Sequence, residues 1–284
     1  MEFPWTAPDG LIFPSERWQP PGEVRGVLIY LHGMNGAATD FNRLAAEVAL
    51  AGYAGYAINL RGQGNDPLPH RRGADLDLYQ LEKDVFAFAE EAIREHPGLP
   101  VFWCGESMGS LLLIHLLASS TFTLPATGAI FSVPVVELRK KTHPALRWAL
   151  RTASLVAPRW RLRPSRFITG EKTPAQVTRD EEYTKISRAS THFIGVFSLG
   201  FLNAIDDLMT ASSRSAEKIR VPSLVLSGGK DVFVHPERIS EWFGTLAAQD
   251  KVLKLYPEAY HCLWNDYDRE LVIADVLSWL RERS

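Results

Sequence analysis

The chain has 284 residues, of which 46% are hydrophobic and 23% are charged, values typical of a globular protein with a sizeable core. The formal net charge of -2 gives no overall field that attracts nucleic acid, so we expect no nucleic-acid partner. The two cysteines, Cys104 and Cys262, have neither a paired nor a metal-type spacing, which argues against a disulfide framework and indicates a reducing compartment.

The N-terminal segment MEFPWTAPDG lacks the basic residues and the long apolar stretch of a signal peptide. No run approaches the roughly 18 apolar residues that a membrane-spanning helix needs. We therefore expect a cytoplasmic protein, with peripheral membrane contact left open. The sequence makes no prediction about an oligomer.

Short apolar runs alternate with longer segments that have apolar residues at helical spacing. Strands are predicted at residues 24–31, 53–60, 101–105, 129–133, 221–228 and 251–256. Helices are predicted at residues 39–51, 78–95 and 269–281, and directly after residue 107. This alternation predicts an α/β fold, with a mostly parallel central sheet and helices on both of its faces.

The alternation stops between residues 134 and 215, where no strand is evident and prolines, arginines and short helical segments dominate. We predict a helical cap (lid) over residues 134–215, inserted into a core that comprises residues 1–133 and 216–284.

A G-x-S-x-G pattern, Gly105-Glu106-Ser107-Met108-Gly109, lies between a predicted strand and a predicted helix. In that context the pattern is typical of a nucleophile elbow, a sharp and strained turn that presents the serine oxygen above the sheet. The short pattern also occurs by chance, but the flanking strand and helix favour the elbow. Ser107 is therefore the predicted nucleophile of an α/β-hydrolase fold.

A serine nucleophile needs a histidine base that is held by a carboxylate, and in this fold they follow in the order Ser, Asp, His. Asp231 and His261 each follow a late predicted strand, so we predict them as the acid and the base. The rival acids are Asp206, Asp207 and Glu258.

The other histidines fit the role of base less well. His70, His96 and His143 lie next to prolines in loops, His115 lies within a helix, His192 lies in the cap, and His235 precedes a predicted helix.

An acyl-transfer site also needs two backbone N–H groups that converge on the oxyanion. The amides of Met108 and Met34 are predicted to supply them, because the first follows the nucleophile and the second follows the strand that ends at His32-Gly33. We count His32 and Gly33 among the substrate-binding residues. A structural role for His32 is the main alternative.

Together these motifs resemble the monoacylglycerol lipase and lysophospholipase branch of the α/β hydrolases, an S33-type family. The matching segments are His32-Gly33, Arg61-Gly62-Gln63-Gly64, the elbow, Gly228-Gly229-Lys230-Asp231 and Ala259-Tyr260-His261. The resemblance implies the same triad, the same oxyanion donors and a lid between residues 134 and 215. The sequence departs from the family pattern at Gln63, at Asn65-Asp66-Pro67 and at Ser110.

The first half of the cap is rich in arginine and lysine, with aromatic and aliphatic residues between them. The basic residues are Arg139, Lys140, Lys141, Arg147, Arg151, Arg159, Arg161, Arg163 and Arg166, and the apolar ones are Leu146, Trp148, Leu150, Leu155, Val156 and Trp160. This composition favours contact with an anionic membrane surface or with an anionic group of a substrate. The alternative is a solvated face whose arginines pair with Glu171, Asp180, Glu181 and Glu182.

The second half of the cap, residues 191–209, is strongly apolar. We predict that Phe193, Phe197 and Phe201, with Leu199 and Leu202, line an acyl-binding pocket, although packing of the cap onto the core explains the same residues.

The predicted reaction is two-step hydrolysis of a small-molecule acyl ester through an acyl-enzyme on Ser107, with no metal and no organic cofactor. A peptidase, a thioesterase or a carbon–carbon hydrolase would use the same triad, and a non-catalytic ligand receptor is the alternative outside enzymes. Cys262 is expected close to the site because it follows His261.

Overall fold

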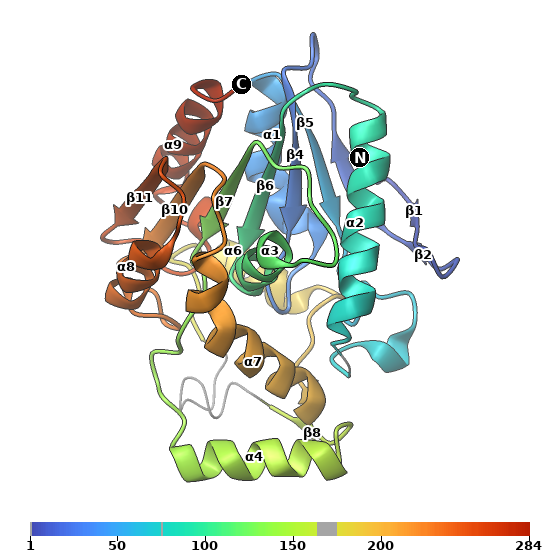
Figure 1. Ribbon diagram of the computed structural model, residues 1–284, viewed down its shortest axis with the longest axis vertical. Helices are drawn as coiled ribbons and strands as arrows, with labels where there is room; N and C mark the ends of the chain where they lie inside the picture. The colour runs from blue at the N-terminus through green and yellow to red at the C-terminus, as the bar shows by residue number, and fades with distance from the viewer. Residues whose placement is uncertain (1, 75, 164–174) are drawn as a thin grey trace.

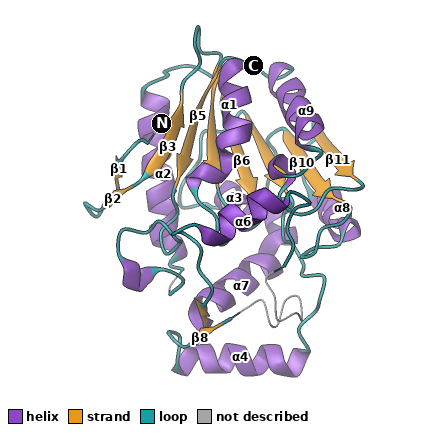
Figure 2. Ribbon diagram, turned by 180° about the vertical axis from the view of Figure 1, so that it is seen from behind, coloured by secondary structure: helices purple, strands orange, loops and turns teal. Residues whose placement is uncertain are grey.

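The computed structural model of the chain describes residues 2–74, 76–163 and 175–284. Within these residues seven strands form one sheet (Figures 1 and 2). They are β3 (Ser15–Trp18), β4 (Gly26–Leu31), β5 (Tyr53–Ile58), β6 (Val101–Glu106), β7 (Gly128–Ser132), β10 (Ser223–Gly228) and β11 (Lys251–Tyr256). Their spatial order is β11-β10-β7-β6-β4-β5-β3, and β3 is antiparallel to its neighbour while the other pairs are parallel.

The central strands are buried on both sides, which explains their nearly continuous apolar sequences. Along β4, Val27, Ile29 and Leu31 pack into one hydrophobic core, and the alternating residues Leu28 and Tyr30 pack into the other. Alternate side chains of a strand therefore pack into two different hydrophobic cores, one on each face of the sheet.

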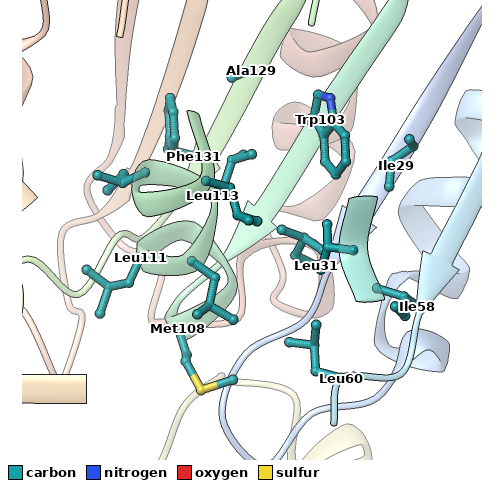
Figure 3. Packing of buried hydrophobic residues seen from close by; sticks show 14 of the residues in the cluster. Ile29, Leu31, Ile58, Leu60, Trp103, Met108, Leu111, Leu113, Ala129 and Phe131 are labelled. Atoms are coloured by element: carbon teal, nitrogen blue, oxygen red, sulfur yellow. The ribbon is translucent and has the colours of Figure 1, made fainter. Parts of the chain in front are cut away.

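Helices cover both faces. The helices α2 (Leu78–Arg94), α3 (Met108–Ala118) and α8 (Pro236–Thr245) pack on one core, while α1 (Asn42–Leu50) and α9 (Arg269–Arg281) pack on the other. Figure 3 shows Leu111 and Leu113 of α3 beside Leu31, Trp103 and Phe131 from three neighbouring strands. The predicted mostly parallel α/β architecture is confirmed.

The predicted strands and helices of the core are all present, with ends that differ by a few residues at most. Three strands near the N-terminus were not predicted: β1 (Trp5–Thr6) and β2 (Ile12–Phe13), which pair in a separate two-stranded sheet, and β3. These strands are short, and their sequences lack the long apolar runs of the buried strands.

Residues between β7 and β10 form the helices α4 (Pro144–Val156), α6 (Glu181–Ala189) and α7 (Leu199–Ala216). The short strands β8 (Arg161–Leu162) and β9 (Phe197–Ser198) pair antiparallel, so the expectation that this segment contains no strand was wrong. Two-residue strands leave no detectable alternation in a sequence. Figure 1 shows α4 farthest from the sheet and α7 between α4 and the core.

The two arginines of α4 are partly exposed and bond acidic residues of α7. Arg147 bonds Asp206 of α7 at 2.8 Å, and Arg151 bonds both Asp206 and Asp207. The solvent-facing side of α4 is apolar, with Trp148 71% exposed and Leu155 and Val156 each 84% exposed. The arginines of α4 therefore pair with Asp206 and Asp207, whereas the predicted partners were Glu171, Asp180, Glu181 and Glu182, and the predicted contact of the basic cap with a membrane stays a prediction.

Asp180 was predicted as one of the acidic partners of the basic cap residues. It pairs instead with Arg43 and Arg269 of the core. Arg166 and Glu171 lie outside the described residues. Among the residues that are described, no helix combines the length and the hydropathy needed to cross a bilayer.

Candidate active site

Ser107 lies in the turn between β6 and α3, at the carboxyl end of the sheet. Its backbone has φ 56° and ψ -114°, a strained conformation for a residue with a side chain. A Cβ atom at Gly109 would overlap the carbonyl oxygen of Leu31, and one at Gly105 would lie 2.6 Å from the carbonyl oxygen of Gly109. The two glycines of the motif therefore permit the close packing that a nucleophile elbow needs.

The side chain of Ser110, one of the positions where the sequence departs from the family pattern, bonds two backbone carbonyl oxygens next to the elbow. Its Oγ lies 2.8 Å from the carbonyl oxygen of Gly105 and 2.9 Å from that of Ser132. The amide of Ser107 also donates a hydrogen bond to Ser132, at 2.9 Å. The side chain at position 110 therefore links the strained turn to β7.

Asp231 and His261 are side by side after β10 and β11. Asp231 Oδ2 lies 2.7 Å from His261 Nδ1, and Oδ1 accepts hydrogen bonds from the amides of Phe233 and Val234. The ring of Phe233 packs edge-on against that of His261, with centroids 4.8 Å apart. These contacts fix the imidazole, and its Nε2 is buried without a hydrogen-bond partner in the described part of the chain.

The rival acids have other partners. Asp206 and Asp207 hold the arginines of α4, and Glu258 is exposed and paired with Lys230. Asp231 is buried and bonded to a histidine that lines the same cavity as Ser107. The arrangement can deprotonate a serine hydroxyl, because Nε2 is available to accept its proton.

His32 does not line the cavity, contrary to its predicted place among the substrate-binding residues. Its ring is completely buried, with Nδ1 2.8 Å from the carbonyl oxygen of Gly33 and Nε2 accepting a hydrogen bond from the amide of Leu60. Burial lowers the pKa of His32 to about 4. The neutral ring ties the loop after β4 to the end of β5, so its role is structural.

The loop after β4 lies directly against the elbow. A Cβ atom at Gly33 would lie 3.2 Å from Cβ of Ser107, so glycine permits this approach. Met34 follows in the same loop, Met108 is the first residue of α3, and both line the cavity that contains Ser107. Both residues therefore lie in the same cavity as the serine, and their role as oxyanion donors stays a prediction.

Asn35 connects this loop to two other segments. Its amide donates to Oε1 of the buried Gln63, at 3.4 Å, and its Oδ1 accepts a hydrogen bond from the amide of Ile194, at 2.9 Å. Gln63 therefore supports the loop from the core, and Ile194 contacts it from the cap.

A cavity of about 630 Å³ opens over Ser107 and His261, within the size range of ligand sites. One wall is apolar. It consists of Phe193 and of one side of α7, where the cavity-lining apolar residues recur every three or four positions: Leu199, Leu202, Ile205 and Met209.

Phe193 thus lines the cavity, but Phe197 and Phe201 do not. Both are completely buried outside the cavity lining, and their tilted rings pack with centroids 4.8 Å apart. Their prediction as pocket residues was wrong because Phe201 lies on the side of α7 that faces the core, and the sequence alone does not assign the two apolar sides of this helix.

Polar residues also line the cavity, and they were not predicted, apart from the position of Cys262. Asp40, Glu106, Tyr183 and Cys262 come from four different segments, and four arginines line the same cavity: Arg147, Arg151, Arg163 and Arg188. Burial raises the pKa values of Glu106, Tyr183 and Cys262, and also that of Asp40. No short motif joins these residues in the sequence, so only the folded chain reveals the cluster.

Among the described residues, no group of three or more His, Cys, Asp or Glu side chains is placed to hold a metal ion.

Comparison with known proteins gives one family and a consistent set of relatives. The model of the family "Serine aminopeptidase, S33" matches residues 22–268. A monoacylglycerol lipase of Mycolicibacterium smegmatis is 27% identical, over 93% of this chain and 90% of its own length. The human monoglyceride lipase is 24% identical (97% and 89%), and the caffeoylshikimate esterase of Arabidopsis thaliana is 25% identical (98% and 84%).

Solved structures show the same fold. The monoacylglycerol lipase of Paleococcus ferrophilus superposes with a TM-score of 0.82 at 22% identity, covering 96% of this chain and all of its own. A soluble variant of the monoglyceride lipase of Saccharomyces cerevisiae, in complex with a substrate analogue, gives the same TM-score and identity, covering 100% and 95%. The α/β-hydrolase fold predicted from the elbow is confirmed.

Proposed function

The chain belongs to the serine aminopeptidase S33 family and is an ester-hydrolysing serine hydrolase, and we propose that it cleaves monoacylglycerol-type acyl esters with Ser107, His261 and Asp231 as its catalytic triad. The observation that carries the proposal is the 2.7 Å contact between Asp231 and His261, in a cavity that also contains the strained Ser107. The names of the relatives support the substrate class.

The proposed reaction has two steps. His261 Nε2 accepts the Ser107 proton as Oγ attacks the ester carbonyl carbon, and the amides of Met34 and Met108 stabilise the oxyanion. The imidazolium, oriented by Asp231, then donates its proton to the leaving alcohol as the C–O bond breaks. Water, deprotonated by the same histidine, attacks the acyl-enzyme and releases the acid.

The mixed lining of the cavity supports a substrate with unlike ends. The apolar side of α7 suits an acyl chain, and the polar lining residues suit the alcohol. A thioesterase or a peptidase would keep the triad. The relatives named as lipases, esterases and a phospholipase favour an oxygen ester over a thioester or an amide.

We also propose that the cap contacts a membrane or lipid-aggregate surface. The exposed side chains of Trp148, Leu155, Val156 and Trp160 form an apolar face on and just after α4. Exposed Lys140 and Arg159 flank this face, which fits an anionic lipid surface. The free thiols of Cys104 and Cys262 are in keeping with our proposal of a cytoplasmic location.

The triad is tested by labelling the purified protein with a fluorophosphonate probe and by assaying short and long p-nitrophenyl esters, monoacylglycerols and aminoacyl amides. We expect covalent labelling and ester turnover, and we expect Ser107→Ala to abolish the labelling and to lower kcat by about 10³-fold or more. Circular dichroism verifies that the variant is folded. Labelling that persists in folded Ser107→Ala would refute the assignment.

A further inference from the structure

His261 lies in an irregular loop after β11, so neither a helix nor a sheet holds its main chain. The peptide amides on both sides of it are hydrogen-bonded instead. The amide of Tyr260 donates to Oδ2 of Asp266, at 2.8 Å. The amide of Cys262 donates to the carbonyl oxygen of Val177 in the cap, at 2.9 Å. The main chain of His261 is thus held by one group of the core and by one group of the cap.

Asp266 is a completely buried carboxylate whose two oxygens have different partners. Oδ2 accepts the amide of Tyr260, while Oδ1 accepts hydrogen bonds from the amide of Tyr267 and from Nε of Arg179, each at 2.7 Å. A buried carboxylate is costly unless a cation pairs with it. Arg179 supplies this positive charge, and its Nη2 also bonds Asp268, at 2.8 Å. The position of the carboxylate, and with it that of the Tyr260 amide, therefore depends on Arg179.

Arg179 belongs to the cap, and the two residues before it bond the same loop, residues 260–266. The carbonyl oxygen of Val177 is the acceptor for the amide after His261. The buried side chain of Thr178 donates a hydrogen bond from Oγ1 to the carbonyl oxygen of residue 265, at 2.7 Å. Val177 also lines the cavity. Three consecutive cap residues therefore connect the cavity lining to the loop that contains the histidine.

We propose that Arg179 and Asp266 are positioning residues for the catalytic base: through this ion pair, the cap holds the main chain of His261 and so sets its place relative to Ser107. The inference deepens the proposed function and rests on it, because it assumes that His261 is the base. The contact with Asp231 orients the imidazole ring, whereas the ion pair holds the backbone that carries the ring.

An ion pair that only anchors the cap would have a different kinetic effect. The cap supplies much of the cavity lining, including one side of α7, so a loosened cap raises KM. A displaced His261 lowers kcat instead, because the attack of Ser107 and the attack of water both need this base. A shift of about 1 Å in a reacting group costs about 10²-fold in rate. The separate effects on kcat and KM therefore distinguish positioning from anchoring.

The test uses Arg179→Met, Asp266→Asn and the double variant, with p-nitrophenyl butyrate as the substrate. We expect each single variant to lower kcat by about tenfold or more and to change KM by less than about threefold. The second-order rate constant for fluorophosphonate labelling should fall in parallel, because labelling also requires a base that deprotonates Ser107.

The double variant should lose no more kcat than the more affected single variant, since both residues act through one contact. It removes both charges together and leaves no buried charge without a partner. It therefore provides the measurement even if Arg179→Met does not fold. Circular dichroism and thermal unfolding verify that each variant is folded at the temperature of the assay.

Arg43→Met is the matched control. Arg43 also forms an ion pair between the core and the cap, with Asp180 at 3.5 Å, but this pair does not include the carboxylate that accepts the amide of Tyr260. We expect this variant to keep kcat and the labelling rate within about twofold of those of the unmodified protein, because a partly exposed ion pair contributes little.

A kcat within about twofold of the unmodified value in the folded double variant would overturn the inference. A rise in KM without a loss of kcat, or an equal loss of kcat in Arg43→Met, would overturn it as well. Losses that multiply in the double variant would show that the two residues act separately, which also contradicts the proposal. The proposed function fails in a different way, by absence of both ester turnover and fluorophosphonate labelling in the unmodified protein.

Discussion

At the scale of single residues, the active site depends on side chains that never touch substrate. The two ring nitrogens of His32 form hydrogen bonds with the carbonyl oxygen of Gly33 and the amide of Leu60. The hydroxyl of Ser110, behind the elbow, donates a hydrogen bond to the carbonyl oxygen of Ser132 in β7. Both residues are buried and uncharged in these roles. Their effect is to fix the loop and the turn that present Met34, Ser107 and Met108.

His32 gives a pH-dependent prediction. Its pKa is about 4 in the folded protein and near 6.5 in the unfolded chain, so the unfolded chain binds the proton first as the pH falls. The stabilisation is complete above pH 6.5 and is lost as the pH falls toward 4, by up to about 3 kcal/mol. Urea unfolding of the unmodified protein and of His32→Asn should show a free-energy difference that shrinks by this amount across the window. A difference that is constant with pH would contradict the buried neutral ring.

At the scale of structural elements, the side chain of Asn35 connects the cap to the loop after β4, which also contains Met34. Asn35, whose φ is 66°, accepts a hydrogen bond from Ile194 just before β9 and donates to Gln63 in the core. Close packing reinforces this contact, because a Cβ atom at Gly64 would overlap the backbone of His192. The position of the amide of Met34 therefore depends on the cap segment as well as on the core.

Asn35→Gly removes the acceptor for Ile194 while permitting the same backbone conformation. Because one oxyanion donor contributes about 10²- to 10³-fold to kcat, a less constrained loop should lower kcat by about tenfold with little change in KM. The measurement is steady-state hydrolysis of p-nitrophenyl butyrate. Asn65→Gly is the matched control, because Asn65 lies in a nearby loop and does not bond Ile194; this variant should retain kcat. Equal kcat values for the two variants would argue that the hydrogen bond between Asn35 and Ile194 does not position the amide of Met34.

At the scale of the whole molecule, the arginines of α4 bond the neighbouring α7, and several apolar side chains of α4 lie in solvent. Arg147 and Arg151 neutralise Asp206 and Asp207 between α4 and α7, so the solvent-facing side of α4 is left with Trp148 and Leu155. Figure 1 places this helix at the end of the molecule opposite the C-terminus. Such a face is suited to lie on a lipid surface above the cavity.

The double variant Trp148→Ser and Leu155→Ser should weaken sedimentation with anionic vesicles by about tenfold or more, since each buried apolar side chain contributes about 1.5–3 kcal/mol. Turnover of a soluble short-chain ester should remain close to that of the unmodified protein. Leu50→Ser, at an exposed position on α1, serves as the control for a lost surface leucine. Negligible binding of the unmodified protein to both neutral and anionic vesicles would rule out the lipid-facing role.

The sequence by itself determined the elements of the core and the placement of the candidate triad. Buried parallel strands have nearly continuous apolar sequences, and the G-x-S-x-G turn and the residues that follow late strands are local signals, so Ser107, Asp231 and His261 were predicted as a triad without coordinates. Tertiary structure alone decided which sides of α4 and α7 face inward, that Phe197 and Phe201 lie in the core, and that Asp40 and Glu106 line one cavity. These properties depend on contacts between segments that are distant in the chain, and a helix that carries apolar residues on more than one side gives no local indication of which side it will bury.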